Sequence, residues 1–270
     1  MKRALRCLLP ALAGAAVMWL LLSRCLVLAL TGRGGEERLP PGEMWTLTAP
    51  DGTALRASVR EAGENWAILV HGWGETGASL ARLGETYRQR GWSVLIPDLR
   101  GCGESGGARR GLGVGDGADL LLWVERIRAV YPEAGILLHG RGLGANAALA
   151  AAGERPEGLI ALVAEDPVES LQELAEACAP GRTLLLWGLR AALKLETGRD
   201  LPSLCVRRQT AGTGVPILFL TGENPVPADA GGLICCAGKG SRLLRLDDRR
   251  EREEAIFAFL TASSGFPQTG

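Results

Sequence analysis

Histidine, the usual base in nucleophilic catalysis, is rare in this chain, and each histidine stands where an apolar run ends. The chain of 270 residues has two histidines, His71 and His139, and each is followed by a glycine. After His139, residues 140–144 read Gly-Arg-Gly-Leu-Gly. A serine or cysteine nucleophile needs a neighbouring base, most often a histidine, to remove its proton. No histidine follows His139, so the remainder of the chain cannot supply an imidazole base.

The composition argues against metal, cofactor and nucleic-acid chemistry. The seven cysteines are irregularly spaced and form no Cys-x-x-Cys pair, which disfavours a zinc site or a disulfide framework. Two histidines are too few for a histidine-rich metal site, and we predict no cofactor. Thirty basic residues balance thirty acidic residues without a basic stripe. A nucleic-acid partner is therefore not expected.

Apolar runs that alternate with helical patterns must position these residues. An opening hairpin is predicted over 45–59, with its turn at Asp51-Gly52. Buried strands are predicted at 66–70, 92–97, 135–138, 159–164, 215–220 and 242–246. Helices are predicted at 79–90, 119–131, after 144 and at 251–261. Strands that alternate with helices predict an α/β fold with a mostly parallel sheet covered by helices on both faces.

Four segments, in this order and spacing, carry a family resemblance. They are His71-Gly72-Trp73-Gly74, Pro-Asp-Leu-Arg-Gly-Cys-Gly-Glu-Ser at 97–105, Leu-His-Gly-Arg-Gly-Leu-Gly-Ala at 138–145, and Pro-Ile-Leu-Phe at 216–219 followed by Gly222. Together they resemble the bacterial membrane-anchored α/β-hydrolases, which are serine hydrolases of aminopeptidase-like type. The resemblance implies the α/β-hydrolase fold, with a small helical cap at about 167–196 over the site.

All three catalytic positions of that family are substituted here. The resemblance places the nucleophile at Gly142, where the family motif Gly-x-Ser-x-Gly has serine. Asn224 is nearest to the position of the acid, and counting back from the closing helix places Ser241 at that of the base. A site with glycine, asparagine and serine at these positions has neither a nucleophile nor a base.

The resemblance implies that the binding pocket survives. The backbone N–H groups of Trp73 and Leu143 would form the oxyanion hole. His71 and Gly72 would shape the loop of that hole, and Arg141 would border the pocket. Asp166 follows the strand at 159–164, where some hydrolases of this fold carry the acid, but without a base we predict a turn role for it. Likewise, His139 is predicted to be a packed or hydrogen-bonded residue.

The N-terminal segment is predicted to anchor the chain in a membrane. Lys2, Arg3 and Arg6 precede an uncharged run over 7–23, and Arg24 interrupts its continuation to Leu30. We predict a retained single-pass anchor at 1–32 in the cell membrane, with the N-terminus inside and the domain outside. A cleaved signal peptide is the alternative. A linker at 33–43, a hydrolase domain at 44–262 and a disordered tail at 263–270 complete the predicted organisation.

Three functions are compatible with this pattern. The first is a catalytically degenerate hydrolase that binds a small acyl or carboxylate ligand, or a partner, near a membrane. The second is an active ester or peptide hydrolase with a non-standard catalytic site, so whether the protein is an enzyme stays open. The third is a membrane-associated structural scaffold. Fold alone cannot separate them.

Overall fold

The strands and helices follow the alternation predicted from the apolar runs. The computed structural model describes residues 2–178, 181–222 and 230–263. Its strands are β1 (Glu43–Thr48), β2 (Ala54–Arg60), β3 (Trp66–Val70), β4 (Ser93–Asp98), β5 (Ile136–Arg141), β6 (Leu159–Glu165), β7 (Ile217–Thr221) and β8 (Arg242–Arg245). Its helices are α1 (Lys2–Thr31), α2 (Ala81–Gln89), α3 (Gly117–Val130), α4 (Leu143–Gly153), α5 (Leu171–Cys178), α6 (Thr183–Thr197), α7 (Arg207–Gly212), α8 (Gly231–Ile234) and α9 (Arg249–Ser263).

The strands form one eight-stranded sheet in the order β1-β2-β4-β3-β5-β6-β7-β8. The predicted hairpin is the antiparallel pair β1–β2, and β2 is also antiparallel to β4. From β4 to β8 the neighbouring strands are parallel. All five residues of β3 are buried, as expected for a central strand that is covered on both faces. The arrangement is the α/β-hydrolase fold, which confirms the predicted fold class.

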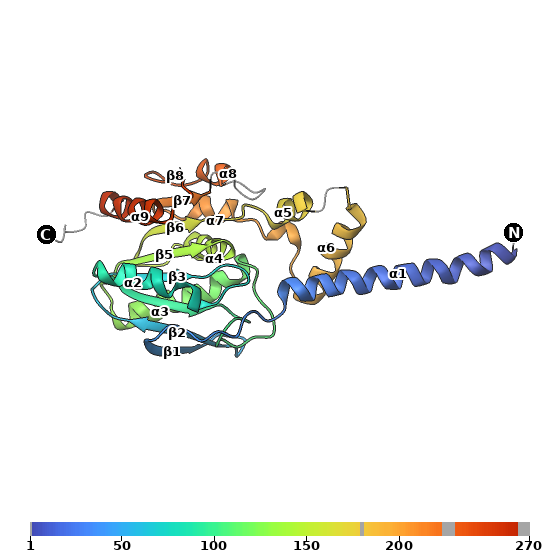
Figure 1. Cartoon of the computed structure of the whole chain (residues 1–270), viewed down its shortest axis with the longest axis horizontal. Helices are drawn as coiled ribbons and strands as arrows, with labels where there is room; N and C mark the ends of the chain where they lie inside the picture. Colours follow the sequence, from blue (N-terminus) through green and yellow to red (C-terminus); the bar gives the residue numbers. More distant parts are fainter. Residues whose placement is uncertain (1, 179–180, 223–229, 264–270) are drawn as a thin grey trace.

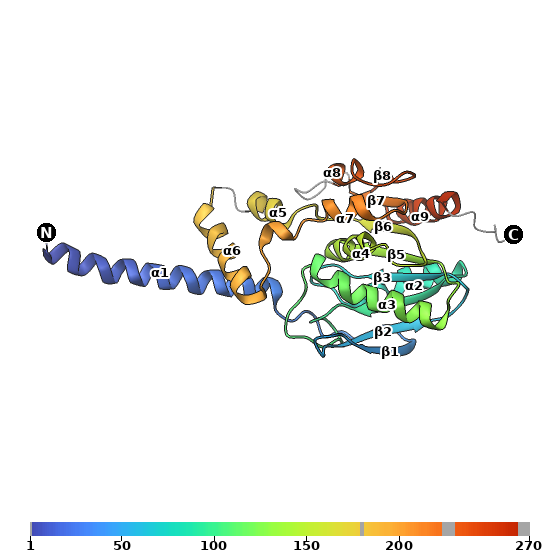
Figure 2. The ribbon, with the colours of Figure 1, turned by 180° about the vertical axis from the view of Figure 1, so that it is seen from behind.

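Helices cover both faces of the sheet (Figures 1 and 2). On one face, Trp123 and Ile127 of α3 and Leu149 of α4 belong to a core that includes Ile68 of β3. On the other face, α2 and α9 cover Leu69 of β3 through a second core of buried side chains. Neighbouring strand residues point to opposite faces, which is why Ile68 and Leu69 belong to different cores.

The cap consists of α5 and α6. Both helices lie at the end of the body from which α1 projects, with α6 beside the inner half of α1 (Figure 2). A third buried cluster joins Val27 of α1 to Leu189 and Leu193 of α6. The indole Nε1 of Trp19 donates a hydrogen bond to the Leu184 carbonyl over 2.9 Å. The end of α1 is therefore packed against the cap.

The segment predicted as a linker lies against the body of the protein. The Arg33 guanidinium donates to the carbonyl oxygens of Gly103 (2.7 Å) and Ser105 (3.0 Å). Leu39 is buried, and its N–H donates to the Glu104 carboxylate. These contacts hold α1 in a defined position relative to the sheet. Of the predicted tail, residues 264–270 lie outside the described part of the chain.

Candidate functional site

The chain turns sharply in an elbow between β5 and α4, with Gly142 at the turn. Gly142 has φ 55° and ψ −123°, a conformation that costs a residue with a Cβ about 1–3 kcal/mol. A Cβ at Gly142 would meet nothing closer than the Gly72 Cα at 3.9 Å. At Gly140 and Gly144, a Cβ would overlap with backbone atoms of the turn and of β3. The outer glycines are therefore needed for packing, and the central one only for its backbone conformation.

The loop after β3 lies beside this turn and is tied to α1. Glu75 accepts the Gly72 N–H through Oε2 over 3.0 Å, which fixes the loop. The Trp73 indole Nε1 donates to the Leu30 carbonyl over 3.2 Å, and the Arg110 guanidinium lies 4.9 Å from the Trp73 ring centre. Leu143 is the first residue of α4, and N–H groups in a first helical turn have no partner within their helix.

His71 is a structural residue. It is fully buried, and its Nε2 accepts the Leu99 N–H over 3.1 Å. The ring is therefore neutral, with the proton on Nδ1, which lies 3.0 Å from the Gly72 carbonyl. Burial lowers the pKa of His71, which favours the same neutral form. With both nitrogens engaged by backbone groups, this imidazole is not available as a base.

His139 is buried inside a polar network. Its Nε2 lies 2.7 Å from Glu165, and its Nδ1 lies 2.9 Å from the Tyr87 hydroxyl. Burial raises the pKa of Glu165, but the His139 hydrogen bond and the nearby Arg141 and Arg252 outweigh burial and lower the pKa to about 2. Glu165 is therefore ionised, and His139 donates to it. The predicted packing role fits these contacts.

Asp166 belongs to an ion pair at the edge of the cavity. It has φ 46°, accepts the Gly222 N–H over 3.1 Å and lies 2.8 Å from Arg252. Arg252 also lies 3.3 Å from Glu165, so one guanidinium joins both carboxylates. Asp166 thus makes turn and ion-pair contacts. The Arg141 Nε lies 3.8 Å from Glu165 and completes the network.

The position assigned to the base needs a correction. Ser241 precedes β8, and its hydroxyl accepts the Ile217 N–H at the start of β7 (3.0 Å). In a parallel sheet, the first residues of the strands lie at one end of the sheet and the last residues at the other end. Ser241 precedes β8 and Gly142 follows β5, so the two residues lie at opposite ends of the sheet. The residues that follow β8 on the elbow side include Asp247, whose carboxylate would lie 2.9 Å from a Cβ at Gly222. Counting forward from the end of β8, instead of back from the start of α9, leads to Asp247 as the residue on the elbow side.

Of two further polar residues, the structure describes only one. Asn224, the nearest match to the acid, lies outside the described residues. Ser105 is fully buried, donates to the Asp98 carbonyl and accepts the Arg56 N–H, so its hydroxyl is a structural tie between loops. Within residues 2–178, 181–222 and 230–263, no group of His, Cys, Asp or Glu is arranged to hold a metal ion.

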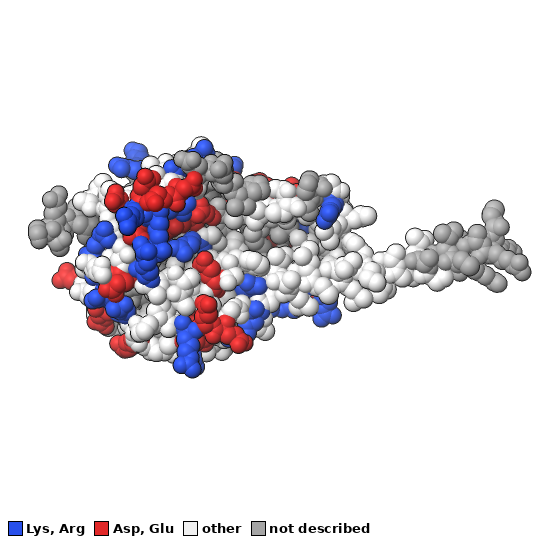
Figure 3. All heavy atoms as spheres, in the orientation of Figure 1, with Lys and Arg blue, Asp and Glu red and all other residues white. Residues whose placement is uncertain are grey.

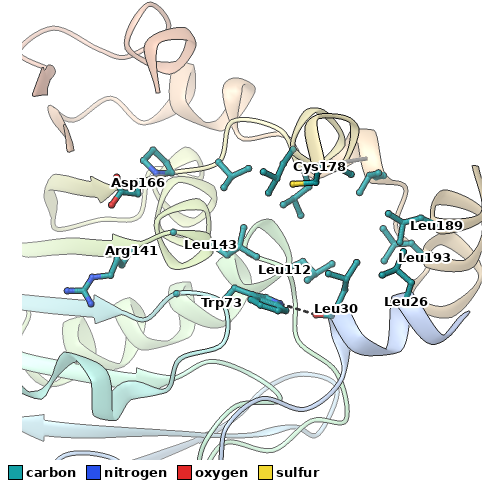
Figure 4. A pocket seen from close by; sticks show the side chains of 18 of the residues that line it. Leu26, Leu30, Trp73, Leu112, Arg141, Leu143, Asp166, Cys178, Leu189 and Leu193 are labelled. Atoms are coloured by element: carbon teal, nitrogen blue, oxygen red, sulfur yellow. Dashed lines mark hydrogen bonds between the residues drawn. The ribbon is translucent and has the colours of Figure 1, made fainter. Parts of the chain in front are cut away.

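A cavity of about 900 Å³ opens in front of the elbow (Figure 4). Its polar end contains Gly142, Arg141 and Asp166, and the remainder is mostly apolar. The apolar wall comes from α1, the cap and nearby loops: Leu26, Leu30, Leu112, Leu171, Leu174, Ala175, Leu185, Leu186, Leu189, Leu193 and Leu201. The sequence did not reveal that α1 would form part of this wall. Size and lining are typical of a site for a small apolar ligand.

Comparison with known proteins agrees with this architecture. Residues 64–224 match the family model described as Hydrolase_4, serine aminopeptidase, S33. No curated protein matches the chain.

Solved structures of three hydrolases share the fold. The esterase Pf2001 of Pyrococcus furiosus is 17% identical over 85% of this chain and 99% of its own, with a TM-score of 0.68. The α/β-hydrolase GrgF of a Penicillium species is 18% identical over 84% of this chain and 100% of its own (TM-score 0.64). A monoacylglycerol lipase of Paleococcus ferrophilus is 20% identical over 78% of this chain and 99% of its own (TM-score 0.58). The chain therefore belongs to the S33 serine aminopeptidase family of α/β-hydrolase-fold proteins.

Proposed function

We propose that this protein is a membrane-anchored α/β-hydrolase-fold protein that binds an acyl-chain ligand and does not cleave it. One observation carries the proposal: an apolar cavity of about 900 Å³ ends at a nucleophile elbow that has Gly142 in place of a serine. Both histidines are buried and engaged, so neither can activate a hydroxyl or a water molecule in the cavity. Binding can persist without the side chains that perform the chemistry.

The backbone and the cavity wall suggest how such a ligand would sit. Its carbonyl or carboxylate oxygen would accept from the N–H groups of Trp73 and Leu143, which form the oxyanion hole in this interpretation. Its chain would extend between α1 and the cap, along Leu30, Leu174 and Leu189. Burial of each methylene group would contribute about 0.8 kcal/mol, so chain length should dominate affinity.

Membrane attachment through α1 is part of the proposal. Residues Leu12–Thr31 are long and apolar enough to cross a membrane, a property that a signal sequence shares. Retention of the helix is favoured because Val27 is fully buried against Leu189 and Leu193 of the cap, and cleavage would expose that cluster. With Lys2, Arg3 and Arg6 before the span, the body would face the extracytoplasmic side.

Two assays on the full chain in detergent test the proposal. A fluorophosphonate probe should label no serine, and a panel of short acyl esters should not be hydrolysed above background. Labelling of a serine would favour the alternative of an active hydrolase with a non-standard site.

Binding is tested with a pyrene-labelled long-chain monoacylglycerol. Ala175→Trp, on the cavity wall, should abolish binding because the indole fills the space that the chain needs. Ala177→Trp is the matched control, since Ala177 is exposed on the same helix. If wild-type protein does not bind the probe or other acyl lipids, the scaffold function is favoured.

A further inference from the structure

The first half of α6 is apolar on the side facing the cavity and on the side facing away from it. Residues 183–189 read Thr-Leu-Leu-Leu-Trp-Gly-Leu and carry no charge. Leu185 and Leu189 line the cavity, whereas Leu184 and Trp187 are 77% and 68% exposed. A helix that is apolar all round is normally surrounded by protein or by lipid. The described residues cover only the inner side of this one.

This half of α6 lies beside the part of α1 that precedes Arg24. The Trp19 indole donates to the Leu184 carbonyl, and a side chain at Gly188 would overlap with the Ser23 hydroxyl. Leu184 is therefore at the level of the apolar span and not at the level of the body of the protein. Because Trp19 precedes Arg24 by five residues, it lies about 7.5 Å further along the helix axis.

On the side of the body, charges begin at a common level on the two helices. On α1 the charge is Arg24, and on α6 the second half carries Arg190, Lys194 and Glu196. Arg182, which precedes the apolar half at its other end, lines the cavity. The Arg24 Nε lies 2.9 Å from the Glu196 carboxylate. Figure 3 shows blue and red side chains dense on the body and sparse along α1 and α6. This boundary resembles that of an interfacial helix, whose apolar side lies about 5–10 Å deep in the membrane.

We propose that the first half of α6 lies in the lipid bilayer beside α1, with Leu184 and Trp187 in contact with acyl chains. The cavity is walled by α1 and α6, so it takes its acyl ligand directly from the membrane and not from water. The ligand class is accordingly a membrane lipid or its monoacyl product. This inference rests on the proposed function, because it names the source of the ligand for that same cavity.

The position of α6 is tested by quenching of tryptophan emission in phosphatidylcholine vesicles that contain the full chain. The emission that is lost in the Trp187→Phe variant is assigned to Trp187. The Trp45→Phe variant, which removes a tryptophan of β1 in the body of the protein, is the control. Trp187 should be quenched by lipids brominated on their acyl chains and shielded from aqueous iodide. Quenching of Trp187 by iodide and not by brominated lipid would overturn the proposal.

The source of the ligand is tested by uptake of pyrene-labelled long-chain monoacylglycerol from vesicles. Leu184→Lys combined with Trp187→Lys should slow uptake about tenfold, because lysine is costly in the bilayer. Binding of a water-soluble short-chain monoacylglycerol should not change, since neither residue lines the cavity. Val130→Lys, an exposed apolar position on α3, is the matched control and should behave as wild type.

The outcomes separate the two proposals. Uptake by the double variant at the wild-type rate would overturn membrane delivery while leaving acyl binding intact. Failure of the wild-type protein to bind either monoacylglycerol would instead overturn the proposed function.

Discussion

At the scale of single residues, the site is defined by Gly142 and by the engagement of both histidines. Gly142 keeps the backbone conformation of an elbow and leaves room for a side chain, whose nearest neighbour would be 3.9 Å away. His71 is held by backbone groups and His139 by Glu165. On the proposed function, restoring one hydroxyl group at Gly142 would therefore not restore a catalytic dyad.

Two glycines of the turn should respond differently to substitution. Gly142→Ser should lower the free energy of unfolding by about 1–3 kcal/mol, because of its backbone conformation alone. Gly144→Ala should cost about 3 kcal/mol or more, because the methyl group would overlap with the His71 and Val70 carbonyl oxygens. Chemical denaturation in detergent measures both. Ester hydrolysis by Gly142→Ser would contradict the assignment of the histidines as unavailable.

Glu165 should make stability depend on acidic pH. Its pKa in the folded protein is about 2, below the ordinary 4.5, so its stabilisation is complete above pH 4.5 and is lost as the pH falls toward 2. At neutral pH, the lowered pKa of Glu165 contributes about 3 kcal/mol to the free energy of unfolding. Glu165→Gln should lose this amount at neutral pH and flatten the pH dependence of unfolding. The exposed Glu157, paired with Arg128, offers Glu157→Gln as a control that should change stability by less than about 1 kcal/mol.

At the scale of elements, the contact between α1 and α6 determines the shape of the cavity. The two helices approach closely at Gly188, and the Arg24–Glu196 pair and the Trp19–Leu184 hydrogen bond flank that point. Arg109 also pairs with Glu196, which ties the same helix end to the loop after β4. The cap is thus held by α1 and by this loop.

Widening this contact should weaken ligand binding. Gly188→Leu would push α6 away from Ser23 and Trp19, and the affinity for the pyrene-labelled monoacylglycerol should fall about tenfold. Ala191→Leu adds a similar volume at an exposed position of the same helix and should leave affinity unchanged. Equal affinities for the two variants would show that the α1–α6 contact does not shape the cavity.

At the scale of the whole molecule, α1 is a structural part of the domain. Val27 is fully buried, and Leu26 and Leu30 form part of the cavity wall. The predicted boundary between anchor and domain therefore runs through a packed region.

Truncations can separate anchoring from packing. A chain that begins at Leu20 retains the packed end of α1 and should bind the monoacylglycerol in detergent. A chain that begins at Gly32 should lose binding, and its unfolding temperature should fall by about 5 °C for the loss of Val27 burial alone. Thermal unfolding followed by circular dichroism measures the second effect. Equal stability of the two chains would show that α1 is only an anchor.

The sequence by itself determined the order of the strands along the chain, the elbow and the absence of a histidine after His139. These features are local, because apolar runs and glycine-rich turns act on their neighbours in the chain. The resemblance to the hydrolase family then placed the nucleophile position at Gly142, and the structure shows that the flanking glycines are required by packing at that turn.

Tertiary structure alone decided which residues share the site. Ser241 precedes β8 and Asp247 follows it, so the two residues lie at opposite ends of this short strand. An error of a few residues in the predicted position of the strand therefore moves a residue from one end of the sheet to the other. The Glu165 network and the place of α1 in the cavity wall join residues far apart in sequence. Such contacts depend on how helices pack against the sheet, and no local pattern records that packing.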